Sequence, residues 1–277
     1  MRFFDRLKNG WELAKISLRT INENRELLLF PVFSTISLIL ILATFFGGTY
    51  FLVGDSIENI MENESVSNIF AYGMIFIYYL INFFIVVFFN SALIHCAMKY
   101  FEGKPTSLGD GIQFAISRIG KIFSWAIVSA TVGTILQVIS ESGKIGEFIA
   151  MFIGAAWSIL TFFVVPILIY EDKSVFDSIK SSTNMMKEKW GESLAGNVSF
   201  SLIMILGLIG AVGIGFLLGY IHPIVGLAVG FIAAILVFTI ISAAKTVFVA
   251  AVYNHVKERP IGDFDGEMLD SVFMQKA

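Results

Sequence analysis

Long apolar runs separated by short polar segments dominate the pattern along the chain. A bilayer core of about 30 Å needs about 20 helical residues at 1.5 Å each, and six runs meet that requirement. We expect membrane spans at about 27–53, 69–99, 122–139, 148–169, 194–220 and 224–253. The connection after the fifth span, Ile221-His222-Pro223, is so short that the last two spans must form an antiparallel hairpin.

The first 24 residues have a different pattern, in which apolar side chains recur at steps of three and four residues. Such steps place them on one face of a helix, opposite basic and acidic residues. The apolar face consists of Phe3, Phe4, Leu7, Trp11, Ala14, Leu18 and Ile21. A helix of this kind lies either in the bilayer interface or against the cytosolic side of its own bundle. It is too charged to be a cleavable signal sequence.

Two other polar segments carry helix start signals of the form S-x-x-D. Ser107 and Asp110 open one amphipathic helix, and Ser174 and Asp177 open another that extends to Trp190. A serine at the N-cap with an acid three residues later satisfies backbone N–H groups at a helix start. The second helix presents an apolar face made of Val175, Ile179, Met186 and Trp190. The acidic segment 54–68 reads as a loop, and the helical pattern of the second span continues to Tyr100.

Composition agrees with a membrane protein. Of the 277 residues, 56% are hydrophobic and 15% are charged, and the mean hydropathy is +0.80. Soluble domains carry about 25% charged residues. The single cysteine, Cys96, excludes an internal disulfide and a cysteine-based metal cluster.

The distribution of lysine and arginine predicts the topology. Six basic residues precede the first span, and about four follow each of the second and fourth spans. The three opposite connections contain only Lys144. Because basic residues mark the cytoplasmic side, we expect six crossings of the plasma membrane, with both termini in the cytoplasm. We expect a single bundle over 1–257 and a cytosolic tail over 258–277.

A unit of amphipathic helix, outward span, returning span and exit tyrosine occurs three times. The exit tyrosines are Tyr100, Tyr170 and Tyr253. Acids favour helix N-termini and tyrosine favours the interface in any hairpin. Internal duplication and ordinary hairpin physics therefore both account for this three-fold repeat. We expect these tyrosines, with Trp11 and Trp190, to be interface anchors.

The segments Pro166–Asp172, Asp177–Ser182 and Lys189–Glu192 carry a resemblance. They resemble an uncharacterised prokaryotic family of six-span proteins. That family is similar to the membrane domain that accompanies some glycerophosphoryl diester phosphodiesterases. The resemblance implies a membrane fold and no enzyme activity, because the phosphodiesterase barrel of about 250 residues has no room in this chain.

Small residues recur every four positions in the later spans, and this spacing lets helix backbones approach closely. On the fifth and sixth spans they are Gly207, Ala211, Gly215, Gly219, Gly226, Gly230 and Ala234. Packing within the bundle and a homo-oligomer interface are the two interpretations.

Polar residues in the spans are the remaining candidates for function. Lys245 is either an anchor whose ammonium reaches the cytosolic edge or a residue facing a polar cavity. Asn82, near the middle of the second span, should hydrogen-bond to another helix. Asn90 is a weaker case of the same kind. The spacing of His95, His222 and His255 matches no metal-binding motif, and the sequence contains no nucleophile elbow or phosphate-binding loop.

The sequence thus predicts an all-α polytopic membrane bundle of six transmembrane helices, with three amphipathic helices at the cytosolic face. We expect no catalytic, cofactor or metal site and no nucleic-acid partner. The favoured function is a non-enzymatic scaffold that contacts lipid or a partner protein through its amphipathic helices. The alternative is a transporter or channel for a small solute or ion, with Asn82, Asn90 and Lys245 lining a cavity between repeats.

Overall fold

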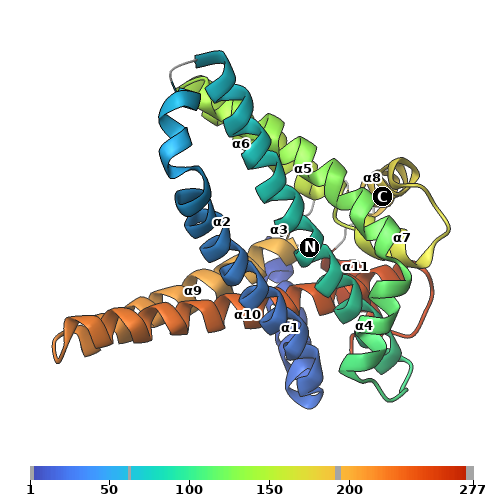
Figure 1. Cartoon of the computed structure of the whole chain (residues 1–277). Helices are drawn as coiled ribbons and strands as arrows, with labels where there is room; N and C mark the ends of the chain where they lie inside the picture. Colours follow the sequence, from blue (N-terminus) through green and yellow to red (C-terminus); the bar gives the residue numbers. More distant parts are fainter. Residues whose placement is uncertain (1–2, 62–63, 191–194, 273–277) are drawn as a thin grey trace. The chain divides into compact units, whose positions relative to one another are not determined.

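The computed structural model describes residues 3–61, 64–190 and 195–272, which form helices and short connections without a strand (Figure 1). Six segments of this described chain are long and apolar enough to cross a membrane. They are Arg25–Phe45, Ile69–Phe101, Ile119–Glu141, Lys144–Tyr170, Phe200–Gly219 and Pro223–Val256. The all-helical class and the six apolar spans expected from the sequence are confirmed.

The chain divides into two compact units that each draw on several stretches of sequence. Unit 1 contains residues 1–32, 92–114 and 184–277, and unit 2 contains residues 33–91 and 115–183. The boundaries fall inside four helices, each of which contributes residues to both units. Each unit is described by itself below.

Unit 1 is built around the hairpin of α9 (Ala195–Gly219) and α10 (Pro223–Val256), whose helices lie side by side (Figure 1). Its turn is formed by residues 220–222, as the sequence predicted. Pro223 is the first residue of α10, where its missing N–H costs no hydrogen bond. In α10, residues 241–254 are mostly buried, whereas the first half is mostly exposed.

Helix α1 (Phe3–Glu23) packs against α9, α10 and α11. Its buried residues follow the spacing of one helix face: Gly10, Leu13, Ala14, Ser17, Thr20 and Ile21. Trp11 and Leu18, which the sequence placed on the apolar face, are only half-buried. Of the two expected placements, the contacts with α9, α10 and α11 agree with packing on the protein's own helices. Four of the six buried residues are small and admit close neighbours.

The described part of the expected tail, residues 258–272, packs on the rest of unit 1. Helix α11 (Gly266–Val272) follows a loop in which Gly262 has a φ of +62°. Phe264 is buried with its ring 5.8 Å from that of Phe101, and Leu269 is fully buried. His255 Nε2 lies 2.9 Å from a carboxylate oxygen of Asp270. Two apolar side chains in a polar segment thus hold the described part of the tail in place.

Unit 2 contains most of α2 (Leu29–Met61), α3 (Glu64–Phe101) and α8 (Val175–Trp190), with α5 (Ile119–Glu141), α6 (Lys144–Leu160) and α7 (Val164–Tyr170). The acidic segment 54–68, expected as a loop, is helical over 54–61 and 64–68. No proline interrupts this segment, so both helices can continue past the apolar runs.

The fourth span is broken between α6 and α7, which the sequence did not predict. Residues 161–163 form a turn, and Pro166 follows within the next turn of helix. Proline has no N–H to donate to the carbonyl of Phe162, four residues earlier, and its ring pushes that carbonyl aside. The break therefore lies where the proline acts, one turn before its own position.

Candidate functional site

The tightest packing in unit 1 is between the glycines of α9 and α10. A Cβ built on Gly215 would lie 2.9 Å from Cα of Gly230, and one on Gly226 would overlap the backbone of Gly219. The two backbones are therefore in direct contact, and these positions have room for glycine only. The stripe continues at Gly207, where a Cβ would lie 2.6 Å from Cγ1 of Val237.

This contact shows packing of the small-residue stripe within one hairpin, and a homo-oligomer interface stays a prediction. The stripe faces its partner stripe within one chain, and Ala211 is 3% exposed beside it. Two other glycines of α9, Gly210 and Gly213, face away, and a Cβ there would meet no described atom within 4 Å. The glycines bring the backbones of α9 and α10 into contact and so hold the hairpin together.

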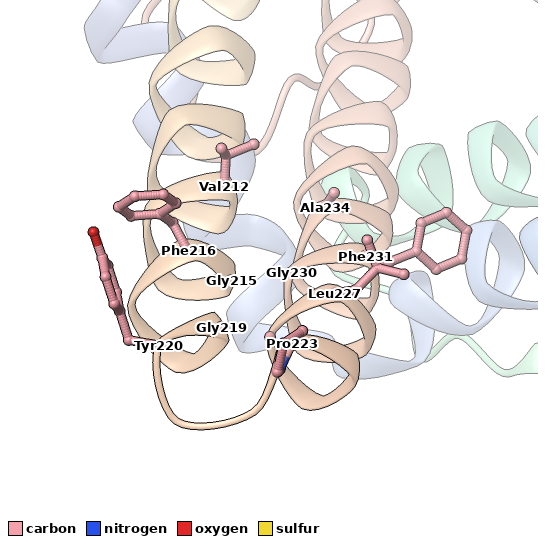
Figure 2. Close-up of a pocket in the computed structure, with 11 residues that line it drawn as sticks. Val212, Gly215, Phe216, Gly219, Tyr220, Pro223, Leu227, Gly230, Phe231 and Ala234 are labelled. Carbon is pink, nitrogen blue, oxygen red and sulfur yellow. The ribbon is translucent and has the colours of Figure 1, made fainter.

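A groove of about 710 Å³ lies between α9 and α10 in the part of the hairpin next to its turn. Figure 2 shows its glycine floor, with Phe216 and Tyr220 on the α9 side and Leu227 and Phe231 on the α10 side. Apart from the Tyr220 hydroxyl, the side chains that line it are apolar. Such a groove offers van der Waals contact and no polar recognition.

A second, smaller pocket lies between the same helices and contains the one lysine within an apolar run. Its volume is about 360 Å³. It is lined by Phe200, Ser201, Met204, Ile205, Phe238, Ile241, Ser242 and Lys245. We call it the Lys245 pocket. Lys245 is exposed, and its ammonium has no ion pair or hydrogen bond with any side chain that the structure describes.

Asn82 and Asn90 are both half-buried on α3. We expected Asn82 to bond to another helix, but its amide donates to the carbonyl oxygen of Tyr78 at 2.7 Å, one turn earlier in its own helix. The acceptor is already within reach on the same face, so the side chain needs no second helix. Asn82 and Asn90 lie in unit 2, and Lys245 lies in unit 1.

The expected interface anchors lie in different environments. Tyr253 is fully buried in unit 1, so it is a core residue and the expectation of an anchor there was wrong. Tyr170 and Trp11 are half-buried. The Tyr100 hydroxyl donates to Glu23 at 2.8 Å. Trp190 ends α8, and its side chain lies outside the described residues.

Charged residues of unit 1 form a junction between α1, α3 and α4 (Leu108–Ser117). Arg19 and Tyr100 both donate to Glu23, and these bonds hold the pKa of that carboxyl below its usual value. Lys99 pairs with Asp110 at 2.8 Å and lowers the pKa of Asp110. The Asp110 N–H donates to Ser107 Oγ at 3.1 Å, which is the predicted cap.

Unit 2 contains a polar closure that the sequence did not predict. The amide of Phe163, in the break between α6 and α7, donates to Ser182 Oγ of α8 at 3.0 Å. Lys121 of α5 reaches the connection before α8, with its Nζ 3.1 Å from both the Glu171 carbonyl oxygen and an Asp172 carboxylate oxygen. Ser182 is fully buried. In the sequence, Pro166 within an apolar run indicates a possible break, but nothing pairs that break with Ser182.

Among the described residues, no group of three or more His, Cys, Asp or Glu side chains is placed to hold a metal ion. The described residues offer helix surfaces, the two pockets of the α9–α10 hairpin and the ammonium of Lys245. These features suit contact with lipid or protein.

Comparison with known proteins identifies the chain at the level of a family. The family of unknown function DUF6159 matches residues 69–263, more than half of the 277 residues. The chain belongs to this family. No curated protein and no solved structure matches the chain. The DUF6159 match extends from the second span to the loop after α10, and nothing in the comparisons links it to the phosphodiesterase-associated membrane domain.

Proposed function

We propose that this protein is a non-enzymatic membrane scaffold that contacts the surface of its bilayer through α8. The observation that carries the proposal is the arrangement of the two faces of this helix. Ser178 and Ser182 are fully buried and Met186 nearly so, at four-residue steps. On the outer side, Phe176 is 73% exposed, and the exposed Lys180 and Lys187 share its face.

An exposed aromatic ring beside lysines is typical of a helix at a bilayer interface. The ring enters the region between headgroups and acyl chains, while the ammonium groups reach anionic headgroups. The Asp177 N–H donates to the Ser174 hydroxyl at 3.1 Å, and this cap starts the helix at Val175, one residue before the ring. Helix α4 supports the same reading, because Ile116 is 54% exposed near its end.

The test places a spin label on this face in the full-length protein, reconstituted in liposomes after Cys96→Ala removes the native thiol. Phe176→Cys carries the label, and Asp172→Cys, whose side chain is fully exposed before the helix, is the control. We expect the label at 176 to collide more with oxygen, which concentrates in the bilayer, than with a water-soluble nickel complex. We expect the opposite preference at 172.

Equal nickel accessibility at the two positions would contradict the proposal. Protection of residue 176 from both reagents would show a protein partner on this face in place of lipid. Solute flux through the same liposomes, lost in Lys245→Met or Asn82→Leu, would favour the transporter instead.

A further inference from the structure

We propose that the Lys245 pocket binds the phosphate headgroup of an anionic phospholipid. This site lies on the α9–α10 hairpin, and the inference does not depend on the role of α8. Its three groups that can donate to a phosphate are the Lys245 ammonium and the hydroxyls of Ser201 and Ser242. The other five lining residues are apolar, so the pocket offers a place to the acyl chains as well.

The charge of the pocket favours an anion. The described residues that line it include a single ammonium and no carboxylate. Ser242 and Phe238 precede Lys245 by three and seven residues, so all three side chains lie on one face of α10. An uncompensated charge among apolar side chains at a membrane is costly. A phosphate brought by lipid removes that cost and accepts the hydroxyl hydrogen bonds.

The depth of Lys245 matches a headgroup. Helix α10 begins at Pro223, and the 22 residues from there to Lys245 span about 33 Å at 1.5 Å per residue. A hydrocarbon core is about 30 Å thick. With the hairpin turn at one surface of the membrane, the ammonium reaches the level of the phosphates at the other surface. This is the predicted cytosolic leaflet, and basic pockets between spans on that side recognise anionic lipids.

A phospholipid fits this pocket better than free phosphate. A soluble anion would satisfy Lys245 but would leave the half-buried Met204 and the exposed Ile205 without an occupant. A phospholipid supplies both parts at once. Phosphatidylglycerol, with one net negative charge, should be preferred to phosphatidylcholine, whose choline cancels the charge of its phosphate.

The experiment uses the full-length protein in a mild detergent and measures lipid binding by native mass spectrometry. Phosphatidylglycerol and phosphatidylcholine are titrated separately, and inorganic phosphate is added in a third arm. Lys245→Met removes the charge at nearly constant shape, and Lys245→Arg keeps the charge. Lys144→Met, at the exposed start of α6, is the control for a general loss of positive charge.

We expect the wild type to prefer phosphatidylglycerol and Lys245→Met to bind it about fivefold more weakly, the factor that one basic residue contributes at an anionic surface. Lys245→Arg and Lys144→Met should bind like the wild type. Ser242→Ala should weaken binding less, and it tests the pocket independently should Lys245→Met fail to fold. Equal binding of the two lipids, undiminished binding by Lys245→Met, or displacement by millimolar phosphate would overturn the proposal.

Discussion

The hairpin α9–α10 of unit 1 and the pair formed by α5 with α6 and α7 in unit 2 follow the same plan in the sequence, a span out and a span back. In the structure they are held together by different means. The first pair touches backbone to backbone at Gly215, Gly226 and Gly230. In the second pair, Trp125 stacks on Trp157 with ring centroids 5.8 Å apart, and the returning span is broken.

The difference shows what each hairpin can tolerate. Glycine contact needs two straight helices and excludes every side chain at the crossing. A span broken by Pro166 has a displaced backbone, so its amide at Phe163 takes an acceptor from a third helix, at Ser182. The glycine contact therefore involves α9 and α10 alone, whereas the broken span takes a hydrogen-bond acceptor from α8.

The largest loss in the free energy of unfolding is expected from a side chain placed in the glycine contact. Gly226→Leu places four carbons where a single Cβ already overlaps the backbone of Gly219. Overpacking of this kind costs about 3 kcal/mol, measured as the free energy of unfolding in mixed micelles by circular dichroism. Gly213→Leu, which has open space on α9, should cost nothing. Equal losses in the two variants would show that the hairpin is not held by its glycines.

A smaller effect is expected at the closure of the broken span. Ser182→Ala removes the acceptor of the Phe163 amide and should lower the free energy of unfolding by about 1–2 kcal/mol. The control is Ser178→Ala on the same buried face, whose hydroxyl donates only to the Ser174 carbonyl of its own helix. That change should cost less than about 0.5 kcal/mol. If the two alanines cost the same, α8 does not close the break.

The smallest expected effect is the response of the unit 1 junction to acid. Glu23 and Asp110 have pKa values below their ordinary 4.5 and 3.8, through Arg19 and Tyr100 for the first and Lys99 for the second. A lowered pKa stabilises the fold above the ordinary value, and that contribution disappears as the pH falls through the folded pKa. Unfolding should therefore become easier below about pH 4.

Lys99→Met tests the origin of this response. It should flatten the part of the pH dependence that belongs to Asp110, whereas Lys180→Met should leave the slope unchanged. The readout is the midpoint of denaturant unfolding between about pH 5 and pH 3. An identical slope in Lys99→Met and the wild type would contradict the assignment to this ion pair.

The sequence predicted the features that depend on local patterns. Helix class, the six spans and the short turn before Pro223 follow from the length and spacing of apolar residues. The caps of α4 and α8 follow from Ser107 and Ser174, because a cap is set within four residues. Each of these features is determined by residues that are close in sequence, either within two helical turns or within one apolar run.

Features that depend on a distant partner were not predictable from the sequence. Pro166 is visible in the sequence, but the hydrogen bond from the Phe163 amide to Ser182 depends on how α8 packs against the broken span. Tyr253 has the sequence pattern of an interface anchor, yet it is fully buried in unit 1. Asn82 could have bonded to any neighbouring span and instead bonds to its own helix.

The central claim is that the chain crosses the membrane six times with its basic segments on one side. It is tested by labelling single cysteines in sealed vesicles with a membrane-impermeant maleimide, in a Cys96→Ala background. Lys144→Cys and Tyr220→Cys should react from one side, and Arg118→Cys and Asp172→Cys from the other. Labelling of residues 144 and 172 from the same side would contradict the six-span account.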